Sequence, residues 1–326
     1  MHFPPDAQQL LGLAQLLGLG LLLLFAAIAG MTLRGLVRPP RVGVAHALSR
    51  GRATTPAELD PPLHAESWTF TSRGRELPVW DVRGLDPRGP VVIVTHGWGE
   101  DRVFTLPRVA ALAPACSRLV TWDLPGHGEA PGSCTLGQRE PEDLAALVHR
   151  VRASTDRPLV LCGSSMGAGI SIAAAAALAD DREHAGLVSG VIAECPYRLA
   201  VEPARNVLRL KGMPSGPTLS VAVALLGLAA GAGPLWRRYD RERLASRLRC
   251  PLLVLHGAED AVSPPEDGRR IAAAAPDGTF VPIEGAGHVA LWAEQPWLDT
   301  CRDAATSFLR RFSQRHPAPA SGAAVA

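Results

Sequence analysis

The sequence is almost without lysine. Lysine occurs once, as Lys211, and the other basic charges are arginines spread along the chain. The 33 basic residues nearly balance the 31 acidic ones, so the formal net charge is only +2. Surfaces that bind nucleic acid usually carry clustered Lys and Arg. The absence of such a basic cluster argues against a nucleic-acid partner. The composition does not indicate the oligomeric state.

Several cofactor motifs are also missing. The sequence contains no H-E-x-x-H, no phosphate-binding P-loop, no G-x-G-x-x-G and no C-x-x-C. No metal and no nucleotide cofactor is therefore expected. The six cysteines are predicted to be small buried residues in a reducing compartment, although their even number leaves disulfide pairing open. They are Cys116, Cys134, Cys162, Cys195, Cys250 and Cys301.

What the sequence does contain is a glycine-flanked serine between an apolar run and an alanine-rich run. Gly163-Ser-Ser-Met-Gly167 follows the apolar residues 158–162 and precedes the apolar residues 170–179. This is the pattern of a strand, a sharp turn and a helix, with Ser165 at the apex. A serine hydroxyl is a weak nucleophile unless a neighbouring base takes its proton, so a catalytic Ser165 requires a partner elsewhere in the chain.

Two later loops supply an acid and a base. Asp260 follows the apolar run 252–255 in His256-Gly-Ala-Glu-Asp260, and His288 follows the strand-like residues 281–283. We predict that Ser165, His288 and Asp260 form a catalytic triad, because serine, acid and histidine occur in this order at the ends of separate strands. Glu194, at the end of the apolar run 187–193, is the alternative acid.

Residues 66–313 resemble an α/β-hydrolase of the esterase, lysophospholipase and monoacylglycerol-lipase type. Two further motifs carry the resemblance: Val91–Gly99 is similar to the oxyanion loop after the third strand, and Trp122–Gly128 to the D-x-x-G-H-G loop after the fourth. The resemblance implies that the backbone amides of Trp98 and Met166 form the oxyanion hole. Candidate residues for the substrate pocket are His96, Trp98, His127 and Leu225. The alternative for His96, Trp98 and His127 is that their side chains shape and pack their own loops.

The expected fold class is α/β, with an eight-stranded, mostly parallel sheet, helices on both faces and a helical cap insertion over 197–249. Continuous apolar runs in the middle strands are typical of a parallel sheet that is covered on both sides. Strands are expected at 67–72, 77–82, 90–95, 118–122, 158–162, 187–194, 251–256 and 279–283. Helices are expected at 102–113, 140–154, 166–180, 264–275 and 291–312.

The N-terminal segment, residues 1–36, is predicted to be a transmembrane anchor. Residues 10–33 carry no charge and would span roughly 36 Å as a helix, against a hydrocarbon core of about 30 Å. Arg34, Arg38 and Arg41 follow, which places the rest of the chain on the cytoplasmic side of the cell membrane by the positive-inside rule. The alternative is a secretory signal cleaved at Ala27-Ile-Ala29, although the n-region lacks basic residues and the apolar stretch is too long.

Three further segments complete the expected organisation. Residues 37–65 are expected to be a linker and 314–326 a disordered tail. The apolar segment Pro217–Trp236 lies within the cap, since a spanning helix there would separate strands of one sheet. It is expected to line an acyl pocket or to lie on the lipid surface. The alternative is an ordinary packed cap helix with a solvated basic end.

These observations predict a membrane-anchored serine hydrolase that cleaves a carboxylic ester or thioester. Its substrate is expected to be a small molecule or a lipid that carries an acyl group. An amidase, peptidase or acyltransferase would share the same acyl-enzyme chemistry. A non-catalytic binding protein on the same fold is the alternative from another class, and the intact triad argues against it.

Overall fold

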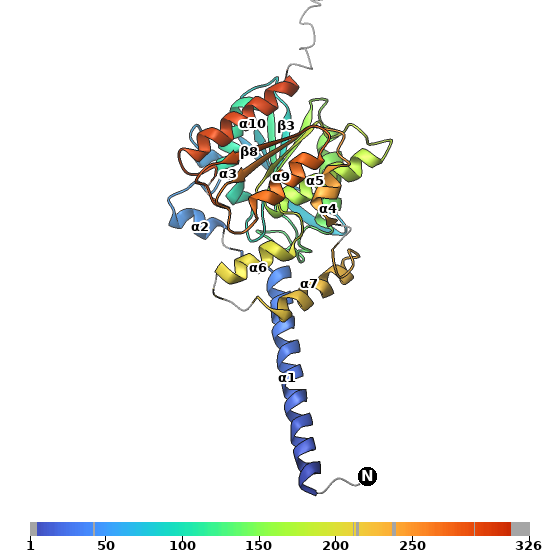
Figure 1. The fold of residues 1–326 in the computed structure, drawn as a ribbon. Coiled ribbons are helices and arrows are strands. Elements are labelled where there is room, and N and C mark those ends of the chain that lie inside the picture. The colour runs from blue at the N-terminus through green and yellow to red at the C-terminus, as the bar shows by residue number, and fades with distance from the viewer. Residues whose placement is uncertain are drawn as a thin grey trace, which may run out of the picture.

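The computed structural model describes residues 5–41, 43–210, 212, 215–236, 239–289 and 291–313. The tail expected at 314–326 and Lys211 lie outside these residues. Figure 1 shows a long N-terminal helix, α1 (Pro5–Val37), that projects from one end of an α/β domain.

The domain is built on one eight-stranded sheet, in the order β1-β2-β4-β3-β5-β6-β7-β8. Strand β2 runs antiparallel to both of its neighbours, and every other pair is parallel. The mostly parallel eight-stranded sheet expected from the sequence is therefore confirmed. The strands are β1 (Ala65–Ser72), β2 (Arg75–Arg83), β3 (Val91–Thr95), β4 (Arg118–Trp122), β5 (Leu159–Ser164), β6 (Gly190–Glu194), β7 (Leu252–Gly257) and β8 (Gly278–Ile283).

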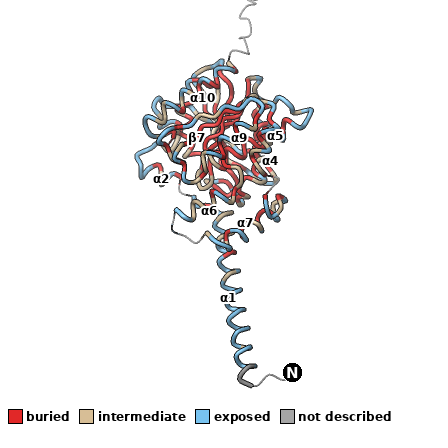
Figure 2. Tube along the Cα trace, in the orientation of Figure 1, coloured by how far each residue is buried: buried red, intermediate tan, exposed pale blue. Residues whose placement is uncertain are grey.

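Both faces of this sheet are buried. Along β3, Val91 and Ile93 belong to one apolar core, and Val92 and Val94 belong to the core on the other face. Successive side chains of a strand point to opposite faces, so an all-apolar strand needs cover on both. One core is covered by α4 (Glu140–Arg152), α5 (Met166–Asp180) and α9 (Pro265–Ala274), and the other by α3 (Leu106–Leu112) and α10 (Trp297–Ser313). Figure 2 shows this buried interior.

Most predicted elements lie within two or three residues of the observed ones, with two larger differences. The helix expected at 102–113 is divided into the 3-10 turn η2 (Arg102–Thr105), α3, and the turn η3 (Ala113–Ala115). The helix expected at 291–312 begins only at Trp297, since the preceding residues form turns. Pro107 and Pro296 stand near these breaks and cannot donate the backbone hydrogen bond of a continuous helix.

The segment expected to be a linker is folded against the domain. It contains α2 (Gly43–Ser49) and the 3-10 turn η1 (Pro56–Glu58). Ala47 of α2 is buried against Val103 and Leu106. The approach is close, because a Cβ added to Gly43 would lie 1.8 Å from a carboxylate oxygen of Asp101. The segment that follows α1 therefore buries apolar surface of its own against the domain.

The cap between β6 and β7 consists of α6 (Val201–Leu210), α7 (Pro217–Ala229) and α8 (Arg241–Ala245). Helix α7 lies beside the end of α1 that joins the domain (Figure 1). Leu33, Leu36 and Val37 of α1 pack against the same core that contains Leu219 and Val223 of α7.

Candidate active site

Ser165 occupies a strained turn between β5 and α5. Its backbone has φ 51° and ψ −112°, a conformation that L-residues rarely adopt. The two flanking glycines make the turn possible: a Cβ on Gly163 would lie 2.2 Å from the carbonyl oxygen of Gly167, and one on Gly167 would lie 2.3 Å from that of Thr95. The amide of Ser165 donates to the carbonyl oxygen of Glu194 at 2.8 Å. Strands β3 and β6, which flank β5 and carry Thr95 and Glu194, therefore hold the turn in place.

The structure brings together the three residues predicted to form a triad. His288 Nε2 lies 3.0 Å from Ser165 Oγ, and His288 Nδ1 lies 2.7 Å from Asp260 Oδ2. These distances are those of hydrogen bonds. If Ser165 donates to Nε2, the proton of His288 resides on Nδ1 and is donated to Asp260. This is the tautomer that a general base requires.

Asp260 is held as an anion. Its Oδ1 accepts hydrogen bonds from the amides of Val262 and Ser263, both at 2.8 Å. Burial by itself would raise the pKa of Asp260, but hydrogen bonds from His256 and His288 outweigh it and hold the pKa well below its usual range. The carboxylate is therefore charged at neutral pH and can stabilise a positive His288.

Glu194, the alternative acid, is committed elsewhere. Its carboxylate accepts from Arg108 Nε at 2.6 Å, from Arg108 Nη2 at 2.8 Å and from Trp292 Nε1 at 2.7 Å. All three side chains are buried. Glu194 thus belongs to a buried ion pair beside the nucleophile, and Asp260 is the carboxylate that contacts His288.

The two amides expected in the oxyanion hole lie on elements next to Ser165. Met166 is the first residue of α5, and first-turn amides have no acceptor within their own helix. The helix dipole adds positive potential at the same end. In the β3 loop, the Gly97 amide already donates to Glu100 Oε2 at 2.8 Å. The Gly97 amide is therefore committed, and the amide of Trp98 stays the one predicted for the oxyanion.

The side chains of the β3 and β4 loops support those loops. His96 is fully buried, with Nδ1 2.7 Å from the carbonyl oxygen of Gly97 and Nε2 accepting from the Leu124 amide at 3.0 Å. Burial lowers the pKa of His96 to about 4, so the ring is neutral. His127 is also fully buried, and burial lowers its pKa to about 3. The indole of Trp98 donates to the carbonyl oxygen of Leu36, at the end of α1, at 2.9 Å.

A cavity of about 240 Å³ opens at Ser165 and His288. Its wall includes Arg108, Glu194 and Trp292, together with Glu100 and Phe104, and His46, Arg50 and Arg52 from the N-terminal segment. A second cavity of about 270 Å³ shares His46, Arg52, Phe104, Pro107, Trp292 and Ala293 with the first, so the two adjoin.

The residues expected to form the substrate pocket lie elsewhere. Among the described residues, the walls of these two cavities do not include His96, Trp98, His127 or Leu225. The two histidines are buried inside their loops, and Leu225 stands half-exposed on α7. Helix α2 is not predictable from the sequence, because a short Gly- and Ala-containing stretch after a proline gives no sign of the side chains it will contact.

A comparison with known protein families identifies the family of this chain. The profile of the alpha/beta hydrolase family matches residues 91–302, which contain all three triad residues. The chain belongs to the alpha/beta hydrolase family.

Curated relatives of this hydrolase are esterases. It is 26% identical over 230 residues to the pimeloyl-[acyl-carrier protein] methyl ester esterase of Neisseria meningitidis, covering 60% of this chain and 70% of that protein. It is 28% identical over 232 residues to the protein of the same name from Chromobacterium violaceum, covering 62% of this chain and 88% of that protein.

Solved structures agree on the fold. An esterase of Pyrococcus furiosus superposes with a TM-score of 0.63 at 19% identity, covering 85% of this chain and 98% of that chain. A thermophilic esterase from Thermogutta terrifontis superposes with a TM-score of 0.54 at 25% identity, covering 77% and 99%.

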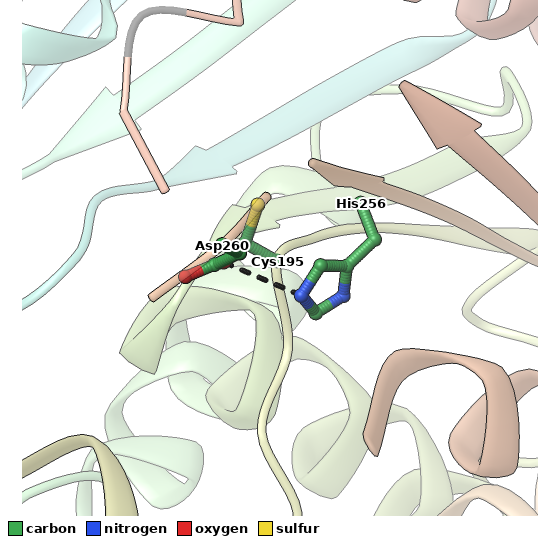
Figure 3. A group of neighbouring side chains, drawn as sticks. All are labelled: Cys195, His256 and Asp260. Atoms are coloured by element: carbon green, nitrogen blue, oxygen red, sulfur yellow. Dashed lines mark ion pairs between the residues drawn. The ribbon is translucent and has the colours of Figure 1, made fainter. Parts of the chain in front are cut away.

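Behind the triad acid, the hydrolase has a buried group of three potential metal ligands, Cys195, His256 and Asp260 (Figure 3). His256 Nε2 lies 3.0 Å from the carbonyl oxygen of Ser263 and 3.3 Å from Asp260 Oδ2. A nitrogen between two oxygen acceptors carries a proton and has no lone pair for a metal. The other ring nitrogen faces the backbone of Gly268, where an added Cβ would lie 2.2 Å away. The group therefore supports Asp260 and does not fit a metal ion.

Asp101, which caps η2, offers a test of the electrostatics in the loop after β3. Burial, and next the charge of Asp123, raise its pKa to about 6 from a usual 3.8. The folded protein thus holds this proton more tightly than the unfolded chain, and stability falls as pH rises from about 4 to about 6. Asp101→Asn keeps an oxygen that can accept from the Val103 amide. We expect it to raise the free energy of unfolding by about 1–3 kcal/mol at pH 8, with little change at pH 4.

Urea unfolding of the protein in detergent at the two pH values measures this difference. Asp156→Asn, at an exposed position, is the control and should alter stability little at either pH. Equal effects of Asp101→Asn at pH 4 and pH 8 would contradict the assignment.

Proposed function

We propose that the protein is a membrane-anchored serine hydrolase that cleaves a carboxylic ester or thioester through an acyl-enzyme on Ser165. The observation that carries the proposal is the unbroken hydrogen-bonded series from Asp260 through His288 to Ser165, at a strained turn that opens into a cavity. Family membership and the ester hydrolases among the relatives support ester chemistry.

The geometry supports a two-step reaction. Ser165 Oγ bonds to the acyl carbon while His288 Nε2 takes its proton, and the amides of Met166 and Trp98 stabilise the oxyanion of the tetrahedral intermediate. When the intermediate collapses, the bond to the leaving group breaks and His288 returns the proton to that group. Water then adds to the acyl-enzyme with His288 again as base, which releases the acid and restores Ser165.

Helix α1 supports membrane anchoring. Its residues Gln8–Val37 form a candidate span, and the apolar 18-residue stretch within it is almost wholly exposed. The alternative of a cleaved signal would place the cut at Ala27-Ile-Ala29, but Ala29 is buried and the helix continues to Val37. These contacts favour an uncleaved anchor. Arg34, Arg38 and Arg41 favour a cytoplasmic catalytic domain.

The adjoining cavities suggest how acyl length is limited. His46 and Phe104 line both, and their rings stack with centroids 5.0 Å apart. We expect His46→Ala to join the two cavities and to raise the kcat/KM ratio of octanoyl to acetyl esters on the order of tenfold, as extra methylenes find apolar surface. A p-nitrophenyl ester series measures this ratio. The control is Val44→Ala, at an exposed position on the same helix, which should leave it unchanged.

Fluorophosphonate labelling tests the proposal directly. The serine oxygen displaces fluoride from the probe and forms a stable phosphonyl ester, which peptide mass spectrometry should locate on Ser165. A parallel panel of p-nitrophenyl esters, acyl thioesters, monoacylglycerols and aminoacyl anilides identifies the substrate class. Folded protein that stays unlabelled would favour the non-catalytic alternative, and faster turnover of anilides would favour an amidase or peptidase. Acyl transfer to an added alcohol in preference to water would indicate an acyltransferase.

A further inference from the structure

Helix α7 presents an apolar face to solvent. Leu219, Ala222, Val223, Leu226 and Gly227 are buried on one side of the helix. The other side carries Val221, Leu225 and Leu228, which are exposed. The helix contains no charged residue along its whole length. A helix on the surface of a soluble domain normally places charged and polar side chains on its outer face, so α7 is unusual for a water-exposed position.

This apolar face continues the apolar surface of α1. The two helices are in contact (Figure 1). Along α1, the described residues before Phe25 are exposed, apart from the half-buried Gly12, whereas Phe25, Ala29, Leu33 and Leu36 are partly or fully covered. The uncovered length from Gln8 to Leu24 is therefore roughly 26 Å of helix. This is close to the hydrocarbon thickness of about 30 Å, so α7 begins where a membrane-spanning α1 would leave the hydrocarbon.

Two other features lie on the segments next to this face, since α7 contacts both α6 and α1. Leu210 at the end of α6 and Leu235 after α7 are also exposed. Arg34 and Arg38, near the end of α1, and Arg209, on α6, are exposed too and form no ion pair within the described part of the chain. An apolar surface bordered by free arginines fits the boundary between acyl chains and anionic headgroups.

The edge of the sheet that carries the catalytic residues faces this surface. Trp98, on the β3 loop, bonds through its indole to Leu36 at the end of α1, and the amide of Cys134 donates to the Val37 carbonyl oxygen at 2.9 Å. The last turn of the anchor is thus joined to the carboxyl edge of the sheet, where Ser165 lies. The opposite edge contains Leu85, which follows β2 and bonds to Ala113.

We propose that the outer face of α7, with Leu210 and Leu235, inserts into the interfacial region of a phospholipid bilayer and holds the catalytic edge against the membrane surface. The substrate of this hydrolase is accordingly an amphiphilic ester that resides in the same leaflet. The inference rests on the proposed anchoring by α1. It goes further in giving the cap a lipid contact of its own.

Spin labels on the full-length protein test this contact. Single cysteines replace Leu225 and Leu228 in a Cys250→Ser background, because Cys250 is the native thiol that is not buried. The labelled protein is reconstituted in nanodiscs of phosphatidylcholine and phosphatidylglycerol, and collision with oxygen is compared with collision with a water-soluble nickel complex. Leu85→Cys is the matched control, since Leu85 is 51% exposed and Leu225 is 49% exposed. Leu16→Cys reports on the anchor.

We expect labels at 225 and 228 to collide with oxygen and to be protected from nickel, as at 16, while the label at 85 meets nickel freely. Nickel access at 225 and 228 equal to that at 85, with 16 still protected, would overturn the interfacial contact and leave the anchor in place. Nickel access at 16 would instead refute the anchoring itself.

Activity provides a second measurement. Leu225→Asp with Leu228→Asp should lower turnover of a long-chain ester in vesicles severalfold while turnover of p-nitrophenyl acetate in solution is retained. Leu85→Asp should change neither. Unchanged vesicle turnover in the double variant would contradict the proposal, whereas an inactive wild type towards both esters would refute the proposed hydrolase function.

Discussion

Replacing Ser165 with alanine is expected to lower kcat on an ester by at least about 10⁴-fold, with little change in KM. Removing the hydroxyl abolishes the acyl-enzyme route, and His288 then has no nucleophile to deprotonate. The amides of the oxyanion hole remain, so a small residual rate above that in water is expected. The loss of fluorophosphonate labelling should accompany the loss of turnover.

The neighbouring serine provides a matched control. Ser164 precedes the nucleophile, and its hydroxyl donates to Glu100 at 3.2 Å, away from His288. Ser164→Ala likewise removes a serine hydroxyl, one residue before Ser165. It should retain turnover within about tenfold, because it leaves the triad intact. Turnover by Ser165→Ala at a level near that of Ser164→Ala would exclude Ser165 as the nucleophile.

The second large effect is expected on stability, from the ion pair between Arg108 and Glu194. Both side chains are buried, and Arg108 contacts the carboxylate with two nitrogens. Arg108→Met would leave Glu194 as a buried charge that, among the described side chains, hydrogen-bonds only to the Trp292 indole. Breaking one side of a buried pair typically destabilises a protein by about 3–5 kcal/mol. Urea unfolding in detergent, followed by circular dichroism, should show a loss of this size.

A second substitution distinguishes charge from packing. Glu194→Gln in the Arg108→Met background removes the unpaired charge and keeps an oxygen for Trp292, so it should recover part of the lost stability. If Arg108→Met costs less than about 1 kcal/mol, or if Glu194→Gln brings no recovery, the buried charge is not what limits stability here.

The turn at Ser165, the acid and the base could be predicted because each depends on a few residues close together in sequence. Gly163 and Gly167 are required by backbone contacts within one turn, and Asp260 and His288 each follow a recognisable strand. Parallel strands place their carboxyl ends at one edge, so the order of the motifs already indicated that they would meet.

The competition between Asp260 and Glu194 could not be decided in that way. Both are acids at the ends of apolar strands, and only the position of Arg108, on a different element, reveals which carboxylate is free to contact His288. An arginine within the apolar run Leu106–Leu112 was the available signal. Its partner lies 86 residues away in the chain.

The sequence by itself determined the fold family, the sharp turn with Ser165 at its apex, and the apolar length of α1, because these follow from local periodicity, local sterics and motif order. Tertiary structure alone decided that α2 forms part of the cavity wall, that the Trp98 indole joins the β3 loop to α1, and that α7 exposes its apolar face beside α1. Each of these depends on which distant surfaces come together, and a side chain carries no local mark of the partner that packing will bring to it.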